Sequence, residues 1–396
     1  MSCITPATGQ ATAMYYVVQE TCGEVPANPV WKRLRFTGGV PAVTRDTLES
    51  AELNGTSELT SIRLGSYNVA GDAAVELYPV DHDDLLACAL QSTWTAGSTV
   101  AGLTVDVDAD AKTFTRAAGS FITDGVTVGS LIRFPGLTGA NSQPLVVTAV
   151  SALVVTAAFA PVAVAELGRA GLADQTAGST SLVIGSNIKV GVARKKIAIL
   201  TVYNDITPGT PVYDLAIDAE ITGFNFSVGV NSIVTGTFNM IGRYFGNNVA
   251  LPTGSTFAPD STKEPFSGFE GGVIYDQSAL GFVSSLEITL DRGAQASFVV
   301  GDKFASHITY TKARSTLTAN TFLYDGNPLK SAFFSEAEKQ VVLVCNDGTN
   351  ATMFRYPRVT ITSAAPQVQE GDIQINAEMQ ASRDTTLATS LQIWSI

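Results

Sequence analysis

The sequence predicts a mainly β protein made of short, mostly antiparallel strands. In the stretch 285–291, Leu286, Ile288 and Leu290 alternate with polar neighbours, and the same period of two recurs over 234–240 and 373–379. A period of two is typical of strands with one buried face. The 35 glycines and 16 prolines punctuate these segments, and long helical periodicity is nearly absent.

The composition favours a chain with proper cores that packs against other protein surfaces. With 396 residues, of which 45% are hydrophobic, the chain is long enough for two or three domains. Charged residues make up only 15%, against roughly 25% in an average soluble protein. A surface poor in charge fits a protein that packs against copies of itself.

The net charge of −12 argues against binding to nucleic acid through phosphate contacts. Such binding needs clustered Lys and Arg that release counterions. An acidic wall would instead let a polyanion slide past without sticking.

The cysteines and the N-terminus indicate assembly in a reducing cytoplasm. Cys3, Cys22, Cys88 and Cys345 are far apart, which argues against a disulfide scaffold or a zinc site. The first ten residues lack the pattern of a signal peptide. No apolar run approaches the roughly 20 residues that span a bilayer, so we expect no membrane insertion.

Two short helices are expected, over 81–90 and 327–334. Asp81 is the expected N-cap of the first, and Asn327 that of the second, with Pro328 at the first helical position. Each helix follows a strand that ends in an aromatic residue, Tyr78 or Tyr324.

The order of elements around these helices occurs twice. Each helix is followed by an apolar strand that ends in Asn-Asp (197–205 and 341–347), and each half later reaches a strand that ends near Met240 or Met379. We therefore expect a tandem duplication of one β-domain with a short helix, although side-chain identity between the halves is low. The expected domains are 1–93 with 191–245, and 246–396.

Residues 94–190 interrupt the first domain and are expected to form an inserted small β-module. Stretches rich in Gly, Ser and Thr flank them at 95–99 and 176–180, and Leu103, Val105 and Val107 alternate inside. Because insertions are tolerated at exposed loop tips, we expect this module to project from the main body.

Motifs of enzymes are absent from the sequence. It contains no GxxxxGK[ST], HExxH or GxSxG pattern. His82 lies among Asp81, Asp83 and Asp84, where an acidic helix start explains the residues better than a cation site. His307 is expected at the surface. We therefore assign no catalytic, cofactor-binding or metal-binding residue and expect a protein that is not an enzyme.

Three further clusters admit two interpretations each. Asp106, Asp108 and Asp110 could bind Ca²⁺, but a solvated strand face is favoured. The basic runs 32–35 and 194–196 could contact DNA, but pairing with acidic residues of a neighbouring subunit or ring is favoured.

The segment 16–36, YVVQETCGEVPANPVWKRLRF, resembles the start of siphophage tail-tube (major tail) proteins, in which an E-T-x-G-x-x-P-x-x-P arm leads into an L-R strand. Segments 45–53 and 69–77 also resemble this family, and so do 356–361, 371–373 and 378–384 near the C-terminus. Within the insert, 119–125 and 129–130 resemble a small β-module found in some of these proteins.

The resemblance implies that each of the duplicated domains is a β-sandwich or half-barrel with a flanking helix, related to the type VI secretion tube protein. It also implies a structural role in the virion. Subunits of such proteins close a β-sheet into rings, and stacked rings form the tail tube through which DNA is ejected. With two domains in each chain, we expect homotrimeric rings. The implied partners are the tape-measure, tail-tip and tail-terminator proteins, and the implied place of assembly is the host bacterial cytoplasm.

Two expectations concern the assembled tube, and one alternative stays open. An N-terminal arm, about residues 1–40, or the loop 246–272 should reach a neighbouring ring, so that deleting residues 1–25 blocks polymerisation but not folding. The lumen should be net negative. The alternative function is a β-sandwich adhesin or carbohydrate-binding module at a virion or cell surface, a role that the insert could fill.

Overall fold

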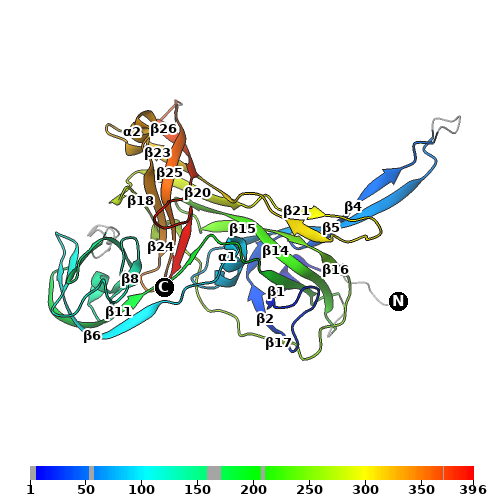
Figure 1. Ribbon diagram of the computed structural model, residues 1–396, viewed down its shortest axis with the longest axis horizontal. Helices are drawn as coiled ribbons and strands as arrows, with labels where there is room; N and C mark the ends of the chain where they lie inside the picture. Colours follow the sequence, from blue (N-terminus) through cyan, green and yellow to red (C-terminus); the bar gives the residue numbers. More distant parts are fainter. Residues whose placement is uncertain (1–5, 53–57, 158–170, 207–209, 369) are drawn as a thin grey trace.

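The computed structural model describes residues 6–52, 58–157, 171–206, 210–368 and 370–396. It confirms a mainly β protein in which the described residues form two α-helices, a large mixed sheet and a small closed barrel. Figure 1 shows an elongated molecule, with the barrel at one end and the long hairpin of β4 (Ala42–Glu49) and β5 (Ile62–Glu76) at the other.

Six strands and one helix form what we call the first repeat. The strands pair antiparallel in the order β1–β13–β14–β15–β5–β4. Their bounds are β1 Thr12–Gln19, β4 Ala42–Glu49, β5 Ile62–Glu76, β13 Lys196–Tyr203, β14 Val212–Gly229 and β15 Thr235–Gly242, and the helix is α1, Asp83–Leu90.

The second repeat has the same order of strands, β18–β24–β25–β26–β23–β20. Its helix also follows the strand in fifth place. The bounds are β18 Gly271–Tyr275, β20 Val283–Asp291, β23 Arg314–Phe322, α2 Pro328–Ser335, β24 Lys339–Asn346, β25 Ala351–Gln367 and β26 Gln374–Ala381.

The strand register of the two repeats agrees, and both repeats have a bulge at the same position. In the first, Met240 lies opposite Ile221, and the register shifts between Ile221 and Gly223. In the second, Met379 lies opposite Ile361, and the register shifts between Ile361 and Ser363. Residues of β14 and β25 therefore correspond at a constant offset of 140 in the sequence numbering.

The two repeats join through β14 and β20. Strand β20 pairs with β14 from Gly223 opposite Asp291 to Gly229 opposite Ser285, and with β23 on its other side. The sheet consequently runs without interruption from one repeat into the next (Figure 1).

One apolar core serves both repeats. Phe224, Phe226 and Phe238 of the first repeat are fully buried and lie together with Phe354 of the second. The ring centroid of Phe354 is 5.6 Å from that of Phe226 and 6.1 Å from that of Phe224. The alternation predicted for 285–291 is confirmed, because Leu286, Ile288 and Leu290 are buried in this core.

Six strands of the interruption form a closed barrel in the order β10–β7–β6–β11–β8–β9. Their bounds are β6 Ser98–Asp108, β7 Thr113–Arg116, β8 Leu131–Arg133, β9 Leu145–Val150, β10 Val154–Ala157 and β11 Gln175–Ile184. The predicted inward positions Leu103, Val105 and Val107 are buried.

The barrel lies at one end of the molecule, as expected, but it packs closely against the second repeat there (Figure 1). Its core is continuous with Val342 and Val344 of β24 and with Trp394 of β27, Gln392–Ser395. Arg355, which is 6% exposed, donates a hydrogen bond of 3.1 Å to the Val128 carbonyl of the barrel. The barrel buries an apolar face of β24 that would otherwise be in contact with water.

The corresponding face of the first repeat is covered by the stretch 246–260. Leu200 and Val202, the counterparts of Val342 and Val344, pack with Trp31 and the partly buried Leu251. Strand β17, Thr256–Phe257, pairs in parallel with β2, Val30–Leu34. This part of the loop 246–272 therefore lies along its own chain.

The expectation of an N-terminal arm is also wrong for the described part of residues 1–40. Strand β1 pairs with both β13 and β2, and Met14, Tyr16 and Trp31 are buried. Pro26 and Pro29 lie in the connection between two paired strands. Deleting residues 1–25 would remove a central strand, so it tests folding and not polymerisation.

The predicted N-cap of the second helix is confirmed and that of the first is wrong. The Asn327 side chain accepts hydrogen bonds from the backbone N–H groups of Leu329 and Lys330 at 3.1 and 3.3 Å. Helix α1 begins at Asp83, after His82, because Asp81 instead faces Arg35 at 3.5 Å.

The remaining elements are short. They are β3 Phe36–Gly38, β12 Ser186–Lys189, β16 Tyr244–Gly246, β19 Ser278–Ala279, β21 Gln295–Ser297, β22 His307–Thr309, β27 Gln392–Ser395 and the 3₁₀ turns Gly9–Ala11, Gly139–Ser142 and Gly268–Glu270. None of the helices among the described residues has the length and apolar character to cross a membrane.

Candidate assembly surfaces

The sheet has two open edges at equivalent places in the two repeats. Among the described residues, β4 pairs only with β5, and the end of β25 from Val359 onward pairs with β26 alone beyond its one contact with Lys339. The matching part of β14, in contrast, has β15 on one side and β20 on the other. Since β4 corresponds to β20, each open edge is one half of the junction formed between β14 and β20.

Prolines mark both edges. Pro41 precedes β4, and Pro366 lies near the end of β25. Proline lacks a backbone N–H and is largely confined to edge strands. These residues limit indiscriminate pairing of the open edges and are the sequence signal by which the edges could have been found.

The hairpin of β4 and β5 projects from the first repeat (Figure 1), and several of its apolar side chains are exposed. Leu48, Leu59, Ile62 and Leu64 are about half exposed. Exposed apolar side chains that gather on one projecting element mark an interaction surface.

Helix α2 also carries exposed aromatic side chains. Phe334 is 75% exposed and Phe333 is 36% exposed. Their counterparts in α1, Ala89 and Cys88, are buried, and Arg292 of the second repeat donates a hydrogen bond of 3.3 Å to the Ala89 carbonyl. Burial also raises the pKa of the Cys88 thiol to about 12. The same position on the surface is thus covered in one repeat and open in the other.

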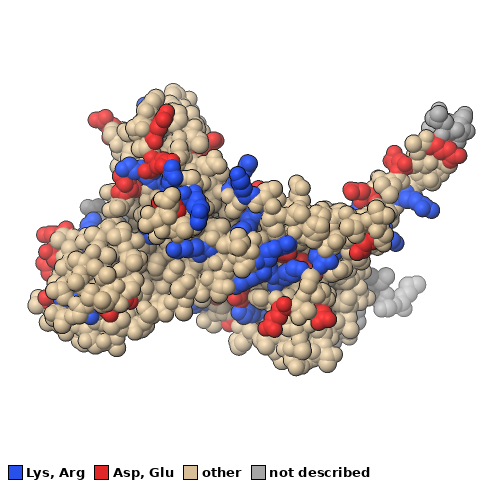
Figure 2. Space-filling view, in the orientation of Figure 1, with Lys and Arg blue, Asp and Glu red and all other residues tan. Residues whose placement is uncertain are grey.

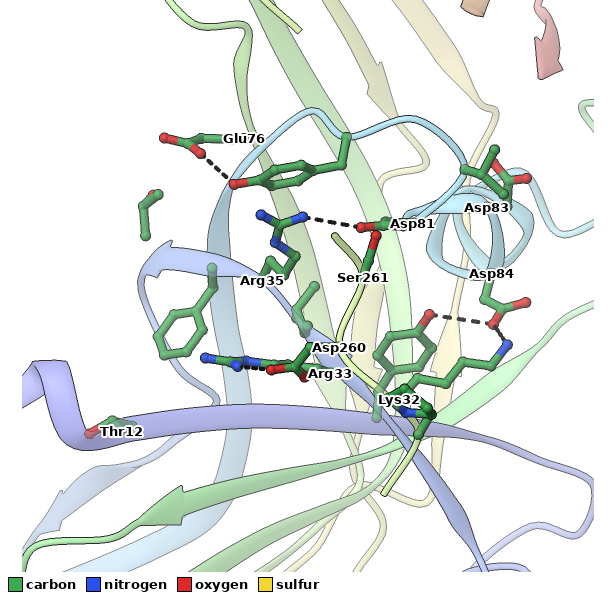
Figure 3. A pocket seen from close by; sticks show the side chains of 18 of the residues that line it. Thr12, Lys32, Arg33, Arg35, Glu76, Asp81, Asp83, Asp84, Asp260 and Ser261 are labelled. Atoms are coloured by element: carbon green, nitrogen blue, oxygen red, sulfur yellow. Dashed lines mark hydrogen bonds and ion pairs between the residues drawn. The ribbon is translucent and has the colours of Figure 1, made fainter. Parts of the chain in front are cut away.

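A charged groove of about 890 Å³ lies between β2, the start of α1 and residues 258–261. Figure 3 shows its basic side chains pointing toward acidic ones. Lys32 contacts Asp84 at 2.5 Å, and Arg33 pairs with Asp260. The prediction that the run 32–35 pairs with a neighbouring subunit is wrong, because its partners lie in the same chain.

Arg35 also lines the groove. Its guanidinium carbon lies 3.5 Å from the centroid of the Tyr78 ring, and the Tyr78 hydroxyl donates a hydrogen bond of 2.6 Å to Glu76. Burial, together with Glu76, raises the pKa of Tyr78 to about 12. The basic and acidic side chains of the groove therefore neutralise one another, and we assign the groove a structural role.

The second basic run also finds its acids within the chain. Arg194 donates two hydrogen bonds to the buried Glu220 at 2.6 and 3.0 Å, and Lys196 lies 3.6 Å from the buried Asp218. Arg243 contacts Asp218 at 3.1 Å. The interpretation that this run serves a neighbour is therefore wrong for Arg194 and Lys196.

The charged side chains are unevenly distributed over the displayed face of the molecule. Figure 2 shows Lys and Arg gathered in a band across the middle of that face, with Asp and Glu toward the ends of the molecule and on the long hairpin.

The two histidines occupy different environments. His82 is 2% exposed and lies at the N-cap of α1, with its Nε2 atom 2.8 Å from the Glu76 carbonyl oxygen. Burial lowers the pKa of His82, which favours the neutral ring. His307 lies on β22 and is exposed, as predicted.

Asp106 and Asp108 are exposed, as expected for a solvated strand face. The Asp106 carboxylate accepts a hydrogen bond from the Ala177 N–H, and that of Asp108 accepts one from the Ala111 N–H. Asp110 lies in the turn beyond β6. In the part of the chain that the structure describes, no group of three or more His, Cys, Asp or Glu could hold a metal ion.

Replacing Asp83 by asparagine should stabilise the protein above pH 7. Burial, together with the nearby Asp84, raises the pKa of the Asp83 carboxyl to about 7. The folded state therefore binds this proton more tightly than the unfolded state, and stability falls as the pH rises from about 4 to 7.

We expect the Asp83→Asn variant to gain on the order of 2 kcal/mol at pH 8, after a discount for the helix N-terminus, which favours the charged form. The gain should vanish near pH 4. Urea unfolding at both pH values measures it, with the exposed Asp110→Asn as the control. A gain that is equal at pH 4 and pH 8 would contradict the assignment.

Comparison with known families assigns the chain as a whole. A search of curated proteins returned no match. The family model for "Phage tail tube protein" matches residues 9–381, which include both repeats and the barrel. The chain belongs to the phage tail tube protein family.

Proposed function

We propose that this protein forms the stacked-ring tail tube of a long-tailed bacteriophage, which serves as the conduit for DNA ejection. The junction between β14 and β20 carries the proposal. It shows how one repeat adds to the next by antiparallel pairing, and it leaves the two halves of the same junction open at β4 and β25.

Repeating that junction between chains closes a ring. Two repeats in each chain and three chains in a ring give six similar units around a threefold axis. Closed rotational symmetry satisfies every edge and stops lateral growth. We accordingly divide the chain into a first tail-tube domain (1–93 and 191–245), an inserted β-module (94–190) and a second tail-tube domain (246–396).

The charge of the chain supports a conduit that does not hold its cargo. A net charge of −12 disfavours binding to DNA phosphates, and we expect the lumen to be net negative. In the virion tail, the ring partners would be further copies of the chain together with the tape-measure, tail-tip and tail-terminator proteins. Assembly would take place in the host bacterial cytoplasm.

Concentrating the purified protein should produce rings and then stacked tubes. Negative-stain electron microscopy across a range of concentrations checks this outcome, with and without tail-initiation components. Particles that stay monomeric under all these conditions would count against the proposal.

A further inference from the structure

We propose that the hairpin of β4 and β5, through its residues 45–52 and 58–67, clamps the second repeat of the neighbouring copy within the same ring and that its Arg45 pairs there with Glu336. This inference rests on the proposed ring. It adds a specific ion pair and a specific strand register, both of which can fail while the ring itself stands.

The paired strands show which residues correspond in the two repeats. On β5 and β23, Val69 and Ser315 occupy equivalent positions, and their partners across the hairpin are Val43 and Leu290. Thr44 therefore corresponds to Asp291. The stretches that follow, 45–67 and 292–313, occupy the same place in their repeats and are nearly equal in length.

The hairpin 292–313 reaches back over the first repeat of its own chain. Arg292, which is 6% exposed, donates hydrogen bonds to Gln91 Oε1 and the Gly191 carbonyl, both at 2.9 Å, and to the Ala89 carbonyl at 3.3 Å. Arg292 thus donates hydrogen bonds to acceptors at the C-terminal end of α1. Burial without a carboxylate partner lowers the pKa of Arg292.

Three further contacts hold the same hairpin. The Phe304 ring stacks on Tyr67 with centroids 4.9 Å apart, and the Tyr67 N–H donates to the Lys303 carbonyl at 2.7 Å. The Tyr310 hydroxyl donates to Glu220 at 2.7 Å. The hairpin of one repeat is therefore a clamp on the repeat beside it.

If a neighbouring copy docks as the second repeat docks on the first within one chain, Arg45 of one copy lies beside Glu336 of the other. Arg45 corresponds to Arg292, the residue after Asp291. Glu336 corresponds to Gln91, because each is the left-handed C-cap residue of its helix. Glu336 is exposed at the negative end of α2, where a guanidinium is favoured by both the carboxylate and the helix dipole.

In the isolated chain, the Arg45 side chain is already held in place by residues of its own hairpin. Its guanidinium lies 4.3 Å from the centroid of the Tyr67 ring and donates to the Gly65 carbonyl at 3.0 and 3.1 Å. No ion pair joins Arg45 to a carboxylate of the residues that the structure describes. Inside the chain, Arg292 pairs with the neutral Gln91. At the proposed interface, Arg45 and Glu336 form a charged pair of the same geometry.

Apolar side chains on both sides fit the same docking. Phe333 and Phe334 are exposed on α2 at the positions where α1 is covered. Leu64, which is 57% exposed, corresponds to Tyr310, a residue that covers the first repeat. Docking of a second copy would bury these three side chains together, which favours association.

The open strand edges then meet in a defined register. Gly223 lies opposite Asp291 and Phe224 lies opposite Leu290 at the internal junction. The equivalent pairs between copies are Ser363 with Thr44 and Ala364 with Val43.

Reversal of the charges tests the ion pair. Arg45→Glu and Glu336→Arg should each raise the protein concentration at which half of the chains are in rings by about tenfold or more. The double variant should recover most of this loss. Arg63→Glu, on the same hairpin, is the matched control and should assemble like the wild type. Circular dichroism confirms that every variant is folded.

A disulfide tests the register. In a background with Cys3→Ser and Cys22→Ser, the pair Thr44→Cys and Ser363→Cys should link chains to each other on oxidation, because opposed residues of antiparallel strands lie within disulfide reach. The pair Thr44→Cys and Ala365→Cys is two positions off and should link far less.

The outcomes separate the clamp from the ring. Wild-type rings that survive both charge reversals unchanged, or that show no preference for the 44–363 disulfide, would overturn the clamp and leave the ring intact. A wild-type chain that never forms rings would instead overturn the proposed function.

Discussion

Replacing Phe354 by alanine should destabilise the whole chain by about 3–5 kcal/mol, because it removes a fully buried aromatic ring at the meeting point of the two repeats. Phe354 belongs to the second repeat and packs beside Phe224 and Phe226 of the first. The vacated volume is enclosed by strands of both repeats and cannot collapse locally.

Urea unfolding followed by fluorescence and circular dichroism measures this effect, and both repeats should unfold at a lower urea concentration. Phe257→Ala is the matched control. Its ring is 44% exposed, and its loss should cost about 1 kcal/mol. A loss of stability confined to the second repeat would show that the repeats do not share a core.

Replacing Gly129 by alanine should loosen the barrel from the second repeat. Gly129 has a φ of +84°, and a Cβ atom there would lie 2.2 Å from Cζ of Arg355. Arg355 is boxed in by Gln340 Oε1 at 2.8 Å and the Val128 carbonyl at 3.1 Å. Either the guanidinium or the barrel must move.

Gly125→Ala provides the control, since Gly125 has a φ of +97° but open space where a Cβ would be. Both variants carry the strain of a left-handed backbone, about 1 kcal/mol. We expect Gly129→Ala to lose about 1–3 kcal/mol more. Limited proteolysis should cut near the barrel junctions in this variant alone. Equal stability and equal cleavage would show that Arg355 does not hold the barrel.

Local features of the structure could be predicted from the sequence. Alternation located the buried faces around Ile288, Phe238 and Met379, since a period of two needs no knowledge of distant partners. Asn327 followed by Pro328 marked the start of α2 for a similarly local reason.

Contacts between distant segments could not be predicted in this way. The basic run 32–35 finds its partners at Asp84 and Asp260, and nothing in a local pattern specifies such separations. The docking of the barrel depends on an apolar face of β24, and a continuous apolar run such as 341–345 does not show what will cover it.

The assembly surface was also hidden from local patterns. Arg45 gains its proposed role only through its equivalence to Arg292, which becomes visible once the register of both repeats is known. Low side-chain identity between the repeats conceals that equivalence in the sequence.

The mass of a single ring tests the account most directly. Native mass spectrometry of rings isolated before they stack should give about 125 kDa, three times the 41.5 kDa of one chain. Image averages of the same rings should show six similar units with threefold symmetry. A ring of about 250 kDa, which contains six chains, would contradict the account, because each chain would then contribute only one unit to the sixfold wall.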